Sequence, residues 1–257
     1  MNVLACLKRV PDTGAKIILT DDQQEIDTTN LGFTMSPHEE CGVEEAIQLV
    51  ADHGGTATAL TLGPEDATEQ VRSAIAMQCD EGVLLETDGE EWGPSNTAHA
   101  IADFVAERAA SDEGFDLLIF GRESADAANH QVGVRVAERL GLPCVTGIKE
   151  IEIDGDTVIA QREIPGAAEV YELPMPAVVT VKEGLNEPRY ASMRARMQAR
   201  RQSVERITPE KATPEPGLQK IRLETPERDE SEAEILGDGP DAVPRIVEVL
   251  EDELEVI

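Results

Sequence analysis

The stretch EGVLLETDGEEWGPSNTAHAIADFVAERAASDEGFDLLIFG, residues 81–121, decides the fold. It begins with the apolar run 81–86 and ends with the most apolar run of the chain, 115–121. Both runs have the length and composition of buried strands. Between them, residues 95–111 place apolar side chains at helical spacing. A strand, a helix and a second strand in this order predict a right-handed crossover between parallel strands.

The same alternation continues on both sides of this stretch. It predicts further strands at 2–10 and 56–63, and further helices at 36–55, 64–79 and 129–142. The helix that starts at Ser36 has this residue as its N-cap, Pro37 at the first position and Glu39 to complete a capping box. Repeated units of this kind predict an α/β fold with a doubly wound, mostly parallel, Rossmann-like sheet covered by helices on both faces.

The pattern changes beyond the last of these helices. Strands at 145–164, 168–173 and 176–184 follow at short spacing, and Asp154-Gly155 is a hairpin signal, so we expect an antiparallel extension at the sheet edge. From about Ile207 the chain is rich in proline and acidic residues and loses its periodicity. We therefore predict an α/β domain at 1–205 and a C-terminal arm at 206–257, whose last segment, 241–257, is a helix that docks elsewhere.

The composition excludes some partners. The chain has 52 acidic and 22 basic residues and a formal net charge of −30, which argues against nucleic acid as a ligand. Such acidity is typical of a disordered protein or of one adapted to high salt, and the regular apolar periodicity speaks against disorder. Lysine is scarce (six) beside arginine (sixteen), which fits a salt-adapted, halophilic prokaryotic protein.

The cysteines, histidines and apolar runs bear on the redox compartment, on metal binding and on insertion into a membrane. Four cysteines lack metal-ligand spacing and are expected to be reduced, buried side chains. His38 and Cys41 could share one helix face, but we expect no metal site. The apolar run at the N-terminus is too short for a signal peptide, and no run is long enough to span a membrane. We expect a cytoplasmic protein.

Familiar catalytic motifs are missing from the sequence, which has no GxSxG, P-loop, HExxH or GxGxxG pattern. Carboxylates are so numerous that no acid–base pair stands out. Three turns follow the predicted parallel strands, at 6–13, 62–64 and 121–133, and ligands bind at such ends of the strands. The third turn enters a helix, where backbone N–H groups attract phosphate. It is either part of an adenine-nucleotide site or an ordinary solvent-facing turn.

Several motifs in order resemble one family. "SPHEECGVEEAIQL" (36–49), "AMQCDEGV" (76–83), "PAVVTV" (176–181) and "NEPRY" (186–190) are similar to the β subunit of electron transfer flavoprotein, and the resemblance covers about residues 1–205. It implies one half of an αβ heterodimer that carries electrons and is not an enzyme by itself. FAD would lie mostly in the α subunit. Electrons would pass from flavin dehydrogenases, such as the acyl-CoA dehydrogenases of fatty acid oxidation, to a quinone oxidoreductase.

The resemblance also implies a nucleotide in the β subunit, AMP in ordinary members or a second FAD in electron-bifurcating ones. Thr13, Arg162 and Glu163 are expected near the flavin or the subunit interface, where Arg162 would favour anionic reduced flavin. The nucleotide pocket carried over from the family consists of Cys6, Ser36, Pro37, His38, Glu39, Leu62, Gly121, Arg122, Glu123, Ser124, Ala125, Asp126, Asn129, Gln131 and Val132.

Two departures bear on the occupant of that pocket. The family usually has asparagine, proline and an aromatic residue where this chain has Ser36, Pro37 and His38. Asp126 is kept from the acidic run of the bifurcating members, but alanines follow it, whereas "VPDT" at 10–13 resembles the bifurcating group. We expect AMP, with a second FAD as the alternative.

An arginine-rich stretch follows "NEPRY". Six arginines lie between positions 189 and 206, and no carboxylate occurs from 188 to 204. In the family this segment is a recognition loop with an apolar anchor for the partner dehydrogenase, and Met193 takes that position. Arg189, Arg194 and Arg196 would steer acidic partners, while some arginines face the α subunit. Met197 is expected to pack in the core.

Two rival functions compete with the one that this resemblance implies. A stand-alone nucleotide-binding regulatory protein would have the same sheet and loops, but it would need neither "NEPRY" nor a long arm. An adenylate-transferring enzyme would be expected to carry a glycine-rich phosphate motif, which is absent from this sequence.

Overall fold

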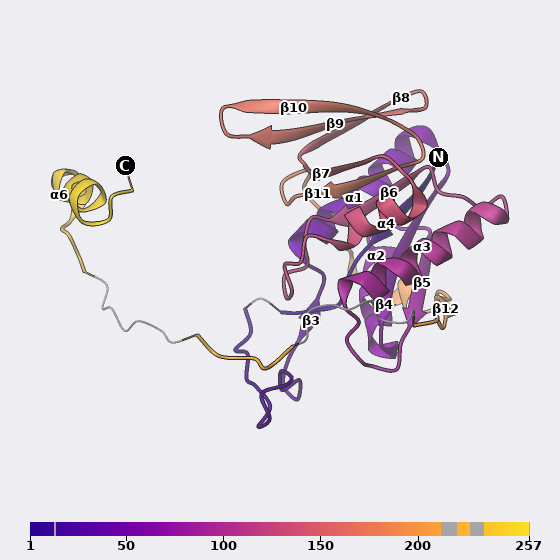
Figure 1. Cartoon of the computed structure of the whole chain (residues 1–257), viewed down its shortest axis with the longest axis horizontal. Helices are drawn as coiled ribbons and strands as arrows, with labels where there is room; N and C mark the ends of the chain where they lie inside the picture. The colour runs from indigo at the N-terminus through magenta and orange to yellow at the C-terminus, as the bar shows by residue number, and fades with distance from the viewer. Residues whose placement is uncertain (13, 212–219, 227–233, 257) are drawn as a thin grey trace.

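A seven-stranded parallel sheet forms the centre of the protein (Figure 1). The computed structural model describes residues 1–12, 14–211, 220–226 and 234–256. The strand order is β12-β5-β4-β1-β6-β11-β7, and every neighbouring pair is parallel. The strands are β1 (Asn2–Cys6), β4 (Thr56–Gly63), β5 (Glu81–Glu86), β6 (Leu117–Gly121), β7 (Cys144–Ile148), β11 (Ala177–Val181) and β12 (Glu205–Ile207). The predicted α/β fold is confirmed.

Helices cover both faces of the sheet, as expected of a doubly wound fold. They are α1 (Pro37–His53), α2 (Thr68–Ala76, after the short η1, Glu65–Ala67), α3 (Pro94–Ala110) and α4 (Val132–Leu140). Alternate side chains of β1 point to opposite faces: Val3 packs in the core under α1, and Leu4 packs in the core under α3 and α4. The two hydrophobic layers hold the ends of the strands, and the loops that follow them, in fixed positions.

Three further strands form a separate antiparallel sheet, β8 (Glu150–Asp154), β9 (Thr157–Ile164) and β10 (Ala167–Pro174). The hairpin predicted at Asp154-Gly155 is confirmed, since Asp154 pairs with Thr157 across the turn. The assignment of 145–148 and 177–181 to this extension is wrong, because β7 is the edge strand of the parallel sheet and β11 lies inside that sheet between β6 and β7. The strand β11 is the more deeply buried of the two. All five of its residues are buried, as is typical of an interior parallel strand.

The first strand ends earlier than predicted. β1 stops at Cys6, and Val10–Pro11 forms a separate strand, β2, that pairs with β3 (Phe33–Thr34). Residues 7–9 therefore form a loop at the carboxyl end of the sheet. This early end places Lys8 among the loops that follow the parallel strands.

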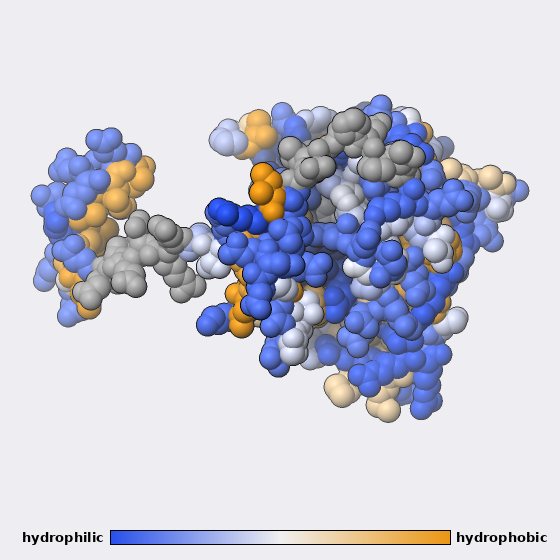
Figure 2. Space-filling view, turned by 60° about the horizontal axis from the view of Figure 1, so that its bottom comes forward, coloured by the Kyte–Doolittle hydropathy of each residue, from blue (hydrophilic) through white to orange (hydrophobic). Residues whose placement is uncertain are grey.

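The last part of the chain stands apart from the sheet (Figure 1). Segment 241–257, predicted as a helix, contains the end of η2 (Gly239–Ala242), α6 (Val243–Glu248) and the π-helical turn η3 (Val249–Glu253). Figure 2 shows hydrophobic residues gathered on this terminal segment, and Val243 and Ile246 are exposed. Its docking partner stays a prediction. Within the described residues, no helix combines the length and apolar character needed to cross a membrane.

Candidate functional site

The candidate site lies where the strand order of the sheet reverses. β1 pairs with β4 on one side and with β6 on the other, so the connections diverge from this point. In doubly wound sheets, ligands bind at the carboxyl ends of the strands at such a switch point. Here those ends are Cys6 on β1 and Gly121 on β6.

The first and third predicted turns meet at this point. Lys8 Nζ lies 2.5 Å from Asp126 Oδ2 and 3.6 Å from Glu91 Oε1. Burial alone would raise the pKa of Asp126, but hydrogen bonds from Lys8 and Ser124 lower it below its usual value. The structure thus joins two turns that are more than 100 residues apart, and it adds Lys8, which sequence reasoning did not single out.

The start of α1 closes the site from a third side. Ser36 is the N-cap, and its N–H donates a hydrogen bond to Glu39 Oε2 at 3.3 Å, the carboxylate half of the predicted capping box. The Ser36 side chain is buried and belongs to the predicted capping box with Glu39. A Cβ atom at Gly121 would lie 2.8 Å from Glu39 Cγ and 3.3 Å from His38 Cβ. The third turn therefore approaches α1 this closely because it starts with a glycine.

Glu39 is buried at the centre of this arrangement. Its burial raises its pKa to about 7, although hydrogen bonds from the Lys8 and Ser36 backbones oppose the shift. Cys6 is also buried, and both burial and the neighbouring Glu39 raise the pKa of its thiol. Neither group therefore behaves as an ordinary surface carboxylate or an accessible thiolate.

Two histidines face one carboxylate at the rim. Glu123 lies 3.5 Å from His38 Nε2 through one oxygen and 2.6 Å from His130 Nε2 through the other. His38 Nδ1 accepts a hydrogen bond from the Glu183 N–H at 2.7 Å. His130 and Ala128 have positive φ values of 54° and 47°, which are uncommon outside glycine and occur often at functional sites.

The remaining residues of the third turn lead into α4. Gln131 is the N-cap, and its side chain accepts hydrogen bonds from Arg135 Nε and Nη2 at 3.0 and 2.9 Å. Val132 is the first residue of α4, and Leu62 lies near the end of β4. Both side chains are partly buried and pack against the core under α3 and α4. The backbone N–H of Arg122 donates to the Val181 carbonyl at 2.9 Å. Ala125 and Asn129 are exposed on the turn.

Arg162 and Glu163 lie in a different place, on β9 of the antiparallel sheet. Arg162 donates to Glu169 through Nε and Nη2 at 2.8 and 2.6 Å, and to the Tyr171 hydroxyl at 2.6 Å. Its Nη1 also lies 3.5 Å from Thr146 Oγ1, in the middle of β7. Glu163 is exposed on the same strand. Thr13 lies outside the described residues.

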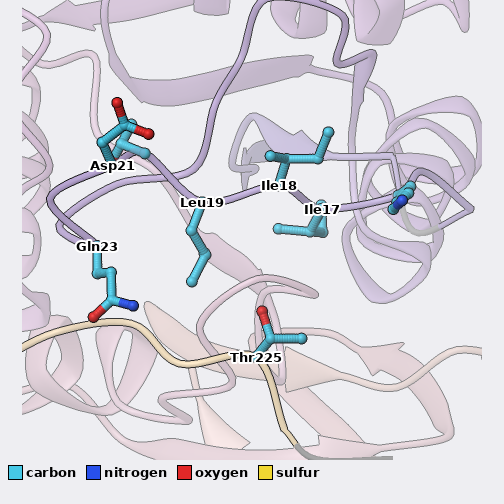
Figure 3. A pocket seen from close by; sticks show the side chains of 8 residues that line it. Ile17, Ile18, Leu19, Asp21, Gln23 and Thr225 are labelled. Atoms are coloured by element: carbon cyan, nitrogen blue, oxygen red, sulfur yellow. The ribbon is translucent and has the colours of Figure 1, made fainter.

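A pocket opens next to the arm, away from the predicted residues (Figure 3). Leu19 of the loop that follows the first turn faces Thr225 of the arm across this pocket. The arm is held here because the Leu223 N–H donates to the Gln23 carbonyl at 2.8 Å and Gln24 Nε2 donates to the Ile221 carbonyl at 2.9 Å. No sequence motif singled out this pocket.

The recognition loop predicted near 186–201 contains the short helix α5 (Met193–Ala199). Met193 is 74% exposed, and Arg194 and Arg196 lie beside it on the helix. The expectation that Met197 packs in the core is wrong, since it is 59% exposed. Arg189 forms an ion pair with Glu44 of α1, with 2.8 Å between Nε and Oε2. Within the described part of the chain, no group of three or more histidine, cysteine and acidic side chains could hold a metal ion.

Comparisons with known proteins agree on one family. The family described as "Electron transfer flavoprotein domain" matches residues 25–212. "Electron transfer flavoprotein subunit beta" of Bacillus subtilis is 33% identical over 264 residues, covering 100% of both chains. The proteins of the same name from Mycobacterium tuberculosis and Homo sapiens are 34% and 33% identical over 213 residues, covering 80% and 81% of this chain and 79% and 82% of theirs.

Proposed function

This chain belongs to the electron transfer flavoprotein family as a β subunit, and from this membership we propose that it works as half of an αβ heterodimer that carries electrons. The FAD of the dimer would be held mainly by the α subunit and would supply the redox chemistry. The electrons would come from flavin dehydrogenases, such as acyl-CoA dehydrogenases, and go to a quinone oxidoreductase. The chain itself would act as a carrier subunit and not as an enzyme.

The switch-point loops fit an adenine nucleotide, for which we propose AMP. One observation carries this part of the proposal: the first turn, the third turn and the start of α1 converge, with Lys8 hydrogen-bonded to Asp126 and His38 Nε2 3.5 Å from Glu123 Oε1. The buried Ser36 side chain at the start of α1 would lie beside a ligand bound at this point. The N-termini of α1 and α4 and the Lys8 ammonium favour a phosphate group. Bound there, the nucleotide would stabilise the loops.

The remaining residues of this chain would bind and orient. Glu39 at the start of α1 would stay largely protonated in the acidic range and so avoid repelling a phosphate. Arg162, held in place by Glu169 and Tyr171, would present positive charge to the flavin side of the dimer. Met193, flanked by Arg194 and Arg196, would anchor the partner dehydrogenase.

Identification of the nucleotide tests this site. The chain is produced together with its α subunit, the purified heterodimer is denatured with acid, and the released nucleotides are separated and quantified. The proposal predicts one FAD and one AMP per heterodimer. Two FAD molecules would instead identify an electron-bifurcating member.

A variant at the switch point tests whether the nucleotide is bound there. Asp126→Asn removes the ion pair with Lys8, and we expect it to lower the AMP content while the FAD content is kept. A colourless chain that stays monomeric and binds ATP would contradict the heterodimer and would favour a nucleotide-binding regulatory protein.

A further inference from the structure

Helix α1 carries two neighbouring carboxylates that the switch-point site does not use. Glu44 is 3% exposed and Glu45 is 8% exposed. Acidic side chains are rarely buried unless they are paired, because removing their charge from water is costly. The burial of these two carboxylates therefore depends on the groups that hydrogen-bond to them.

Residues 186–189 supply those groups. Asn186 Nδ2 donates to Glu45 Oε2 at 2.8 Å and to the Cys41 carbonyl at 3.0 Å. Arg189 donates to Glu44 three times, from its backbone N–H at 3.0 Å, from Nε at 2.8 Å and from Nη2 at 2.9 Å. We call these four side chains, Glu44, Glu45, Asn186 and Arg189, the carboxylate clamp.

The pKa values of the two carboxyl groups are shifted in opposite directions. Burial would raise the pKa of Glu44, but the hydrogen bonds from Arg189 and Gln48 lower it below its usual value. Burial raises the pKa of Glu45, and the single hydrogen bond from Asn186 offsets only part of this shift. The Glu44–Arg189 pair is thus the ionised half of the clamp.

The chain is fixed again on the far side of the exposed segment. Ala199, at the end of α5, is buried against Val71 and Ile75 of α2. At the near end of the segment, Arg189 Nη1 donates a hydrogen bond to Gln78 Oε1 at 2.7 Å, just beyond the end of α2. The segment 190–198 is therefore attached to the body at both ends.

Three large side chains project from this segment, and we call them the exposed platform. Tyr190, Met193 and Met197 are 87%, 74% and 59% exposed. Arg196 lies over the Tyr190 ring at 5.1 Å, so the platform also carries positive charge. Apolar side chains held out in water between two fixed points form a preorganised contact surface, which lowers the entropy lost on binding.

We propose that the carboxylate clamp positions the exposed platform for its partner, so that Glu44 and Glu45 act through Arg189 and Asn186 to set where Met193 is presented. The inference rests on the proposed function in one respect, namely that the platform contacts the partner dehydrogenase. The clamp suits an acidic, salt-adapted protein, because a buried ion pair is screened by salt far less than exposed arginines are.

Glu44→Gln in the purified heterodimer tests the clamp, because glutamine keeps the size of the side chain and removes the charge that Arg189 contacts. We expect trypsin to cleave after Arg194 and Arg196 faster, since the segment is released at one end. We also expect the KM for the heterodimer in the dehydrogenase assay to rise about tenfold, with kcat and flavin content unchanged. Glu113→Gln, which breaks an exposed ion pair with Arg108, is the matched control and leaves both readouts unchanged.

Two additions separate positioning from loss of stability. In a Met193→Ala background, Glu44→Gln should raise the KM little further if the clamp acts through Met193, whereas independent effects would multiply. If Glu44→Gln does not fold, Asn186→Ala breaks the other half of the clamp and takes its place.

The outcomes distinguish this inference from the proposed function. Unchanged cleavage in both Glu44→Gln and Asn186→Ala overturns the inference, whatever the platform binds. A raised KM for Met193→Ala together with an unchanged KM for Glu44→Gln also overturns it and leaves the proposed docking site standing. If Met193→Ala leaves the KM unchanged as well, both the docking site and the inference are wrong.

Discussion

Glu39 lies at the start of α1 with its carboxyl group buried between the first and third turns. Its pKa of about 7 stands above the ordinary value of 4.5, chiefly because burial disfavours the charged form. The folded protein therefore holds a proton on this group at pH values where the unfolded chain has lost it. Such a group stabilises the fold fully below pH 4.5, and its contribution is lost as the pH rises to about 7.

Replacing Glu39 with glutamine should remove this pH dependence. Between about pH 5 and pH 7 the parent protein should lose stability relative to Glu39→Gln by up to about 1.4 kcal/mol per pH unit. Urea unfolding of both proteins across this range measures the difference. Glu113→Gln, at an exposed carboxylate, is the control that should run parallel to the parent. Equal pH slopes for the parent and Glu39→Gln would show that Glu39 titrates as a surface group.

At the scale of the elements, the packing of α2 on β5 shows how tightly the layers fit. Gly82 lies on β5 directly beneath this helix. A Cβ atom at this position would overlap Val71 Cγ1 and would lie 2.9 Å from Ile75 Cδ1. Both side chains belong to the small cluster that also buries Ala199 of α5. The glycine therefore allows the close approach of helix and strand that supports the recognition loop.

Gly82→Ala should push α2 away from the sheet and destabilise the protein by about 1–3 kcal/mol, the usual cost of overpacking a core. Chemical denaturation gives this free energy of unfolding directly. Gly32→Ala is a suitable control, because its new methyl group would meet Asp12 at ordinary contact distances, 3.8 Å from Cβ and 4.0 Å from Oδ2. If the two variants were equally stable, the contact between α2 and β5 would be looser than described.

Much of the fold could be predicted from local sequence signals. Ser36, Pro37 and Glu39 mark the start of α1 by chemistry that acts within one turn of helix, and the structure has its N-cap at Ser36. The strand 177–181 was placed wrongly, because a short apolar run does not say which neighbours it will pair with. The strand at Glu205–Ile207 was missed, since three residues carry no periodicity.

The candidate site was less predictable than the fold. The turns that contain Cys6 and Gly121 follow from the rule that ligands bind at the ends of parallel strands. Lys8 was overlooked because its role depends on Asp126, a partner 118 residues away. The pairing of Glu44 with Arg189 was hidden for the same reason, since local spacing cannot reveal a contact across 145 residues. The role of the predicted residues in binding remains a proposal.

At the scale of the whole molecule, the net charge of −30 sets the conditions for stability. The face drawn in Figure 2 is mostly hydrophilic, and repulsion among so many carboxylates opposes the compact state. Salt shortens the range of this repulsion to about 3 Å at 1 M, while the apolar core is unaffected by screening. The composition is therefore consistent with a protein that works at high ionic strength.

Stability should rise with salt. Between about 0.1 M and 2 M potassium chloride we expect the thermal midpoint of the heterodimer to increase by at least about 3 °C, because screening removes repulsion in the folded state. Calorimetry or circular dichroism at matched pH measures the midpoint. A midpoint that stays constant or falls over this range would contradict the proposed adaptation to salt.

Reduction of the heterodimer by a dehydrogenase tests the central claim most directly. The chain is purified with its α subunit, mixed under anaerobic conditions with an acyl-CoA dehydrogenase and its acyl-CoA substrate, and its visible flavin absorbance is followed. The proposed function predicts a yellow heterodimer whose flavin absorbance is bleached on mixing and returns when an electron acceptor is added. A flavin that stays oxidised, while the same dehydrogenase reduces an artificial dye, would contradict it.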